Sequence, residues 1–401
     1  MLPWRACGQL VVRTSFHPHP LRSRCFGTVG RLQTPEVVSV PCLGNGNITI
    51  EIHPSSRANH HNKASPAVAV YLPRGPCLTA EEDDESNISI LRSSLACPIV
   101  RVNYRCNKHH QFPTAIHDVT SAFDFIVSNL LPKRALIRPG RSEHVGTLAV
   151  CGELVGGQLA TALALTECRA GEPGIVTAAV SNPIADWTEL DIDFLSDTTK
   201  LSKSRAEQLN LELERLRAQR NILFRKPEHY FDPFASPILF FRSPGIHIPE
   251  MTDQKILDDM DLLALFAREE HVRHESAAVS ALPVEDPPSA HERERPPRRT
   301  SGRFPSKALN LRLPSFHITA GLGSALSDQA AELAEQLKRS LARQSKTPTL
   351  GIGSLLDKSF SAPDMGRIMC QTYAGMGLWN ASNEGKARMT EAARWIAREL
   401  Q

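Results

Sequence analysis

The sequence predicts an α/β fold with a mostly parallel central sheet flanked by helices. Short unbroken apolar runs, such as "AVAVYLP" at residues 67–73 and "PIVRVNYR" at residues 98–105, are typical of strands buried on both faces. Stretches with helical periodicity separate these runs, and this alternation indicates a parallel sheet. With 401 residues, 41% of them apolar, the chain is long enough to bury a large core.

The first half of the chain supplies most of the predicted sheet. Residues 37–40 and 47–53 alternate in the manner of strands around the turn "GNGN". An acidic first turn and a short apolar face predict a helix within 79–95, between the two buried runs. Apolar residues at helical spacing predict a second helix within 112–130.

The remaining elements continue the alternation of strands and helices, with one helical insertion among them. Residues 147–152 and 175–183 are predicted strands, with a turn and a helix between them at 150–167. Residues 187–245 are polar and helical, with an apolar seam at Leu209, Leu213 and Leu216. The sheet then resumes, with strands predicted at 313–321 and 366–377 and helices at 327–343 and 384–400.

This pattern divides the chain into five predicted parts. They are a targeting or disordered N-terminus at 1–35, a first part of the core at 36–186, a helical lid at 187–245, a largely disordered linker at 246–306, and a second part of the core at 307–401. The linker prediction rests on residues 268–306, which are rich in Pro, Arg and Glu and poor in apolar residues.

Charge and cysteine content limit the cellular compartments and the classes of partner that the sequence predicts. The first acidic residue is Glu36, and the basic start before it is typical of a mitochondrial transit peptide; the alternative is a disordered basic tail on a cytoplasmic protein. The nine cysteines are scattered without a C-x-x-C pair, which favours a reducing compartment. A net charge of +3 does not indicate nucleic acid as a partner, and no apolar run reaches the roughly 20 residues of a transmembrane helix.

The segment "VCGELVGGQLATALALTE" at residues 150–167 reads as a strand end, a tight turn and a helix. Gly152 and Gly156 give the glycine frame of a nucleophile elbow, with Leu154 at the centre. Together with "VRVNYR…FPTAIHDVTSAFDFI", "YFDPFASPILFFR", "LPSFHITAG…SDQAAELAEQL" and "GMG…EAARWI", this turn resembles the α/β-hydrolases of the hormone-sensitive-lipase-like branch and their fungal relatives. The order of the pieces is more specific than any one of them.

The resemblance implies a Ser–His–acid triad and an oxyanion hole, and all four parts are altered. Leu154 stands in the serine position. Gly323 in "ITAGLGSAL" stands in the acid position, and Leu378 in "AGMGLWNAS" in the histidine position. The oxyanion loop after "AVAVYLP" reads "PRGPCLT" and keeps only Gly75.

These substitutions lead to the expectation of a hydrolase fold without hydrolase chemistry, a pseudoenzyme that binds a small apolar ligand or a protein partner. The alternative is a divergent carboxylic-ester hydrolase or acyltransferase that uses other residues, with fungal secondary metabolism as one setting for it. A third interpretation makes residues 187–305 a partner-docking part on an inert scaffold.

A ligand site is predicted from backbone N–H groups at the start of the helix that follows the elbow, because these groups do not depend on the altered side chains. The N–H groups of Val155 and Gly156 at the helix start are expected to hold a carboxylate or phosphate. Gly75 and Glu153 complete this hypothetical site. No metal motif and no cofactor motif occurs in the sequence.

Other reactive side chains receive structural interpretations. Cys151 lies in a buried strand and is expected to be an inert small hydrophobe. Ser181 and Ser324 are expected to serve turns or caps, and His317 to be packed within a strand. Asp118 is expected on the wet side of its helix.

Overall fold

The computed structural model describes residues 34–42, 44–56, 66–78, 81–131, 146–191, 203–248, 304–345 and 365–401. The predicted targeting segment up to residue 33 and residues 249–303 of the predicted linker lie outside these ranges, so both remain predictions. Among the described helices, none has the length and apolar character needed to cross a membrane.

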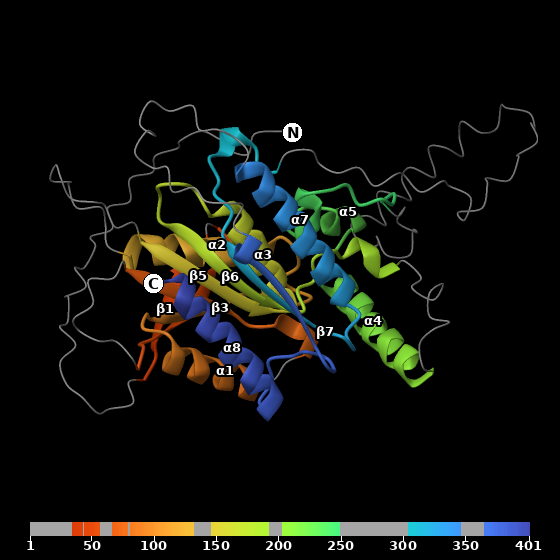
Figure 1. Ribbon diagram of the computed structural model, residues 1–401, viewed down its shortest axis with the longest axis horizontal. Coiled ribbons are helices and arrows are strands. Elements are labelled where there is room, and N and C mark those ends of the chain that lie inside the picture. The colour runs from red at the N-terminus through yellow and green to blue at the C-terminus, as the bar shows by residue number, and fades with distance from the viewer. Residues whose placement is uncertain are drawn as a thin grey trace, which may run out of the picture. The chain divides into compact units, whose positions relative to one another are not determined.

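The described residues build an eight-stranded sheet in the order β1-β2-β4-β3-β5-β6-β7-β8 (Figure 1). β1 and β2 pair antiparallel with each other, β2 pairs antiparallel with β4, and all later neighbours are parallel. The mostly parallel sheet is therefore confirmed. The strands are β1 Glu36–Pro41, β2 Asn47–His53, β3 Ala67–Leu72, β4 Ile99–Asn103, β5 Thr147–Glu153, β6 Gly174–Ser181, β7 Ser315–Gly321 and β8 Ile368–Tyr373.

Helices cover both faces of this sheet (Figure 1). α2, α3 and α7 lie on one face, and α1 and α8 pack together on the other. All six predicted helices are present. The α-helices are α1 Glu81–Ser94, α2 Thr114–Asn129, α3 Val155–Thr166, α4 Lys203–Leu223, α5 Pro227–Tyr230, α7 Ser327–Ser345 and α8 Asn383–Glu399.

The alternation of side chains along the strands creates two hydrophobic cores. On β5, Val150 belongs to the larger core against α2 and α3, whereas Ala149 and Cys151 belong to the smaller core against α1 and α8. Trp379 and Trp395 fill the smaller core and are almost fully buried. An unbroken apolar strand is thus explained by burial on both faces.

The described residues of the region predicted as a lid, 187–191 and 203–245, form several helices. They include the short helix η2 at Thr188–Asp191, α4, α5 and η5 at Pro237–Phe240. α4 buries Leu213 and Leu216 and contacts η2 and η1, the short helix at Gly75–Leu78. Since η1 follows β3 and η2 follows β6, α4 lies at the carboxyl edge of the sheet. The division into domains remains a prediction.

Candidate functional site

The turn between β5 and α3 holds Leu154 in a strained backbone conformation. Its φ of 52° and ψ of −115° lie in a region that non-glycine residues rarely adopt. The flanking glycines are required by close backbone contacts: a Cβ at Gly152 would lie 2.5 Å from the carbonyl oxygen of Gly156. A Cβ at Gly156 would lie 2.3 Å from that of Leu72. The turn therefore has the backbone form of a nucleophile elbow.

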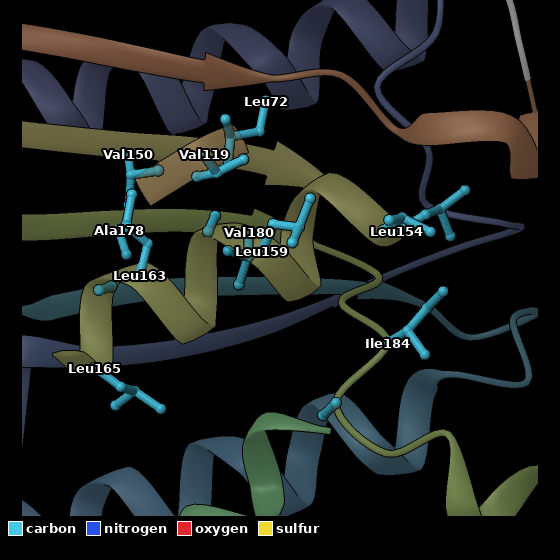
Figure 2. Packing of buried hydrophobic residues seen from close by; sticks show 14 of the residues in the cluster. Leu72, Val119, Val150, Leu154, Leu159, Leu163, Leu165, Ala178, Val180 and Ile184 are labelled. Atoms are coloured by element: carbon cyan, nitrogen blue, oxygen red, sulfur yellow. The ribbon is translucent and has the colours of Figure 1, made fainter. Parts of the chain in front are cut away.

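The side chain at the centre of this elbow is surrounded by hydrocarbon. Leu154 is 3% exposed and belongs to the larger core, and the half-buried Leu378 packs against the same core. Figure 2 shows Leu154 beyond the end of its strand and Ile184 on the neighbouring loop, and the N–H of Ile184 donates to the carbonyl of Leu154 at 3.5 Å. The positions predicted for the serine and the histidine thus both border the same large apolar core.

Three loops converge at this carboxyl edge. The N–H of Gly323 donates to the carbonyl of Gly375 at 2.8 Å, which joins the acid-position turn to the loop that leads to Leu378. The hydroxyl of Ser181 donates to the carbonyl of Gly377 at 3.2 Å and ties the end of β6 to the same loop. The structure therefore brings the predicted positions into one region.

The predicted ligand site has a compact backbone setting. Gly75 has a φ of +75°, and a Cβ there would lie 3.1 Å from the Val155 Cβ and from the Tyr104 hydroxyl. Val155 and Gly156 occupy the first turn of α3, where N–H groups have no acceptor within the helix. Their binding of a carboxylate or phosphate remains a prediction.

Glu153 is engaged inside the protein. Its carboxylate accepts from the Arg74 Nε at 2.8 Å and from the Trp379 N–H at 2.7 Å, and it is 2% exposed. Burial raises the pKa of Glu153, while the ion pair with Arg74 and the Trp379 N–H oppose the shift. Both of its oxygens are therefore used to hold the loop that carries Leu378 beside the elbow.

Arg74 is the centre of this buried network, and sequence reasoning missed it. Its guanidinium also pairs with Asp83 at 2.8 Å and donates to the carbonyl of Trp379 at 2.9 Å. The available signal was a charged residue directly after a buried strand, facing a glutamate that ends the neighbouring strand. We name Arg74, Glu153, Asp83 and the backbone of Trp379 the arginine clamp.

The rival nucleophiles and bases named from the sequence are held in structural roles. Cys151 is 1% exposed, and burial raises the pKa of its thiol to about 12. His317 is buried against Trp395 with ring centroids 5.3 Å apart, and its Nε2 pairs with Gln371 at 3.0 Å. Burial lowers the pKa of His317, so its neutral form is favoured. Within the described ranges, no serine or cysteine side chain is hydrogen-bonded to a histidine.

One serine at this edge has a carboxylate partner from another element. The hydroxyl of Ser324 donates to the Glu212 Oε1 at 2.8 Å, and the Ala325 N–H donates to the Glu212 Oε2 at 2.7 Å. Ser324 is 4% exposed, follows the acid-position turn, and also accepts from the Leu326 N–H at 3.2 Å. Burial raises the pKa of Glu212, while the hydrogen bonds from Ala325 and Ser324 oppose the shift.

The turn role expected for Ser324 is thus present, but the base beside it was missed. Glu212 comes from α4, where "LELERL" looks like a solvated helical face. Its raised pKa and its contact with a hydroxyl give it the properties of a general base. In the part of the chain that the structure describes, no group of three His, Cys, Asp or Glu side chains is arranged to hold a metal ion.

Comparison with known proteins agrees with this architecture. A family model described as "alpha/beta hydrolase fold" matches residues 77–250. No curated protein matches the chain.

Several solved esterases have a similar structure. An esterase from the archaeon Pyrobaculum calidifontis aligns with 92% of this chain and 84% of its own length, at 18% identity and a TM-score of 0.51. Carboxyl esterase 2 from the fungus Tuber melanosporum aligns over 94% and 89%, at 13% identity and a TM-score of 0.53. The metagenomic carboxylesterase EstE1 aligns over 93% and 92%, at 16% identity and a TM-score of 0.51. At these identities the likeness shows the fold.

These findings correct one expectation. We expected from the four altered positions that the chain is not an enzyme, but the match to a family model of α/β-hydrolases over residues 77–250 contradicts this expectation. The interpretation as a non-catalytic binding protein therefore gives way to the divergent-hydrolase alternative. The chain has the α/β-hydrolase fold, as the sequence resemblance implied.

Proposed function

We propose that the chain is a divergent hydrolase of carboxylic esters that works at the carboxyl edge of the sheet with residues other than Ser–His–acid at Leu154, Leu378 and Gly323. The fold and its esterase neighbours support the reaction class. The observation that carries the proposal is the hydrogen bond from the Ser324 hydroxyl to the Glu212 carboxylate. A serine needs such a base to become a nucleophile at neutral pH.

The proposed chemistry follows from this pair. The Ser324 oxygen attacks the ester carbonyl while its proton passes to Glu212. The protonated Glu212 then gives that proton to the departing alkoxide, which leaves as an alcohol, and an acyl ester remains on Ser324. Water then attacks this ester while Glu212 accepts its proton. Glu212 returns that proton to the Ser324 oxygen as the acyl–oxygen bond breaks, which releases the carboxylic acid and free Ser324. An alcohol in place of this water gives acyl transfer.

The surroundings of the pair bear on the substrate. Burial makes the Glu212 carboxylate a stronger base than an exposed glutamate, which favours proton transfer. Because Ser324 is 4% exposed, small acyl groups are the substrates this position favours.

The first prediction tests the pair with p-nitrophenyl acetate and a fluorophosphonate probe. Ser324→Ala and Glu212→Gln are each expected to lower kcat by about a hundredfold or more, because each removes one partner of the proton transfer. Ser324→Ala is also expected to abolish labelling by the probe. Turnover is measured by nitrophenol release, and the labelled residue by peptide mass.

The matched control is Ser382→Ala. Ser382 caps α8 by accepting from the Gly385 N–H at 3.1 Å, so this change removes a serine cap without touching Glu212. The control should keep its kcat. In the wild type, kcat/KM should rise with pH through a pKa above the usual 4.5 of glutamate, because only ionised Glu212 accepts the proton. Wild-type protein that hydrolyses no p-nitrophenyl acetate, or a Ser324→Ala variant of undiminished kcat, would contradict the proposal.

A further inference from the structure

A cavity of about 520 Å³ opens at the edge of the sheet opposite the elbow. Its lining includes Thr147, Gly174 and Ser315, the first residues of β5, β6 and β7. The seven residues of β5 separate this edge from Leu154 by about 23 Å at a strand rise of roughly 3.3 Å per residue. The cavity is therefore distinct from the proposed ester site, and its volume suits a small-molecule ligand.

Three arginines from three segments line this cavity. They are Arg169 after α3, Arg312 before β7 and Arg367 before β8, and we name the cavity the arginine pocket. Two glutamates, Glu172 and Glu399, also line it, so three positive charges against two negative ones leave a net charge of +1.

Hydrogen bonds within the protein hold the backbone around the pocket in place without a ligand. The segments of Arg169 and Arg312 pair with each other: the Arg312 N–H donates to the Cys168 carbonyl at 2.8 Å, and the Ala170 N–H donates to the Asn310 carbonyl at 3.0 Å. The Arg367 guanidinium donates to the Leu313 carbonyl at 2.5 Å, which sets its position. The backbone positions of Arg169 and Arg312 and the guanidinium of Arg367 are thus set in advance, which lowers the entropy lost when a ligand binds.

Three polar side chains of the pocket have no hydrogen-bond or ion-pair partner among the described residues. Arg169 and Arg312 are exposed, and their guanidinium groups make no hydrogen bond or ion pair with any described residue. The Thr147 hydroxyl oxygen is buried and has no hydrogen-bond partner there either. Burial raises the pKa of the neighbouring Cys168 to about 12, so its thiol stays neutral and adds no competing anion.

We infer that the arginine pocket binds a small hydroxylated polyanion, whose phosphate or carboxylate groups pair with Arg169, Arg312 and Arg367. Guanidinium groups match phosphate and carboxylate oxygens in planar, two-point contacts. The carboxylates of Glu172 and Glu399 accept hydrogen bonds from hydroxyl groups and repel a ligand that carries only anionic groups. Sugar phosphates and hydroxylated polycarboxylates both have this combination.

Calorimetric titration of the full chain with glucose 6-phosphate and with citrate tests the inference, with glucose as the neutral control. At least one of the two anions should bind saturably at one site, and glucose should not. The double variant Arg169→Gln/Arg312→Gln should weaken that binding about tenfold or more, because it removes two charge-assisted contacts. Arg394→Gln, which changes an exposed arginine of α8 outside the pocket, should leave it unchanged.

The two anions separate the chemistry of the ligand. Tighter binding of glucose 6-phosphate assigns a phosphate ligand, and tighter binding of citrate assigns a polycarboxylate. Affinity should fall as salt is added, because ions screen the exposed arginines. The inference is overturned if neither anion binds at about 10 mM, or if the double variant binds as tightly as the wild type. Either result leaves the proposed ester chemistry unaffected, since Ser324 lies at the opposite edge.

Discussion

Leu154 combines an unfavourable backbone with a favourable side-chain environment. A φ of 52° is costly for leucine, at about 1–3 kcal/mol for such conformations. Burial of its side chain in the larger core offsets this cost, since a fully buried leucine gains roughly 1.5–3 kcal/mol. The elbow conformation therefore persists with a side chain that has no hydroxyl to expose.

A second prediction concerns this residue. Leu154→Ala should lower the free energy of unfolding by about 2–5 kcal/mol, because it leaves a cavity in the core. Leu378→Ala should cost roughly half as much, because Leu378 is half-buried and loses less contact. Urea unfolding of both variants measures the difference. An equal or larger cost for Leu378→Ala would show that the two side chains do not share the core as described.

At the scale of elements, the arginine clamp joins α1, through Asp83, to three segments that are distant from one another in the sequence. Arg74 follows β3, Glu153 ends β5 and Trp379 lies between β8 and α8. When one partner of a buried ion pair is removed, the other charge remains buried without a compensating charge, which destabilises the folded state. The loop that carries Leu378 is thus held against the elbow by a charged group and not by apolar packing alone.

A third prediction tests the clamp. Arg74→Met should lower the free energy of unfolding by about 3–5 kcal/mol, because Glu153 is left buried without its partner. Lys338→Met, which breaks the exposed pair with Glu335, should change it by less than about 1 kcal/mol. Chemical unfolding of the two variants gives both values. A cost for Arg74→Met as small as that for Lys338→Met would remove the structural role assigned to the clamp.

The elements themselves were predictable, and their long-range polar contacts were not. Periodicity located the strands and helices because burial on a sheet face or helix face repeats locally. Asp118 shows the limit: it was expected on the wet side of its helix, yet it is fully buried and pairs with Arg105 at 2.6 Å. Glu212 was hidden in the same way, because its partner Ser324 lies far along the chain. A pattern within one helix does not reveal what another segment brings to it.

The positions of the candidate site could be predicted from the sequence, but their chemistry could not. Leu154, Gly323 and Leu378 could be placed because a glycine frame and strand order are local features of the sequence. The chemistry at that edge could not be read from these positions alone. The expectation of a non-enzyme followed from the four altered positions and from assigning Ser324 to a turn, because the sequence did not indicate its contact with Glu212.

For the whole molecule, buried titratable groups set opposing pH dependences. Burial lowers the pKa of His53 and His317, so the unfolded chain binds more protons than the native one as pH falls below 6.5. Burial raises the pKa of Glu153 and Glu212, so their ionisation costs native stability as pH rises above 4.5. The histidine contribution to stability is complete above pH 6.5 and is lost on acidification.

A fourth prediction follows for His317. The wild type should lose stability as pH falls below about 6.5, and His317→Gln should lose less over the same interval, because one histidine that resists protonation is gone. His109→Gln, at an exposed position, should follow the wild type. Thermal unfolding from pH 8 to pH 5 compares the three proteins. Parallel curves for wild type and His317→Gln would contradict the assignment.

The close approach of two turns at Gly323 constrains any attempt to graft a triad onto this scaffold. A side chain there would begin 3.1 Å from the carbonyl oxygen of Gly375, which is tighter than ordinary atomic contact. An aspartate would also bring its negative charge beside that electron-rich oxygen. Any side chain grafted at Gly323 therefore requires the Gly375 turn to shift by a few tenths of an ångström, so the design of a triad on this scaffold has to include that turn.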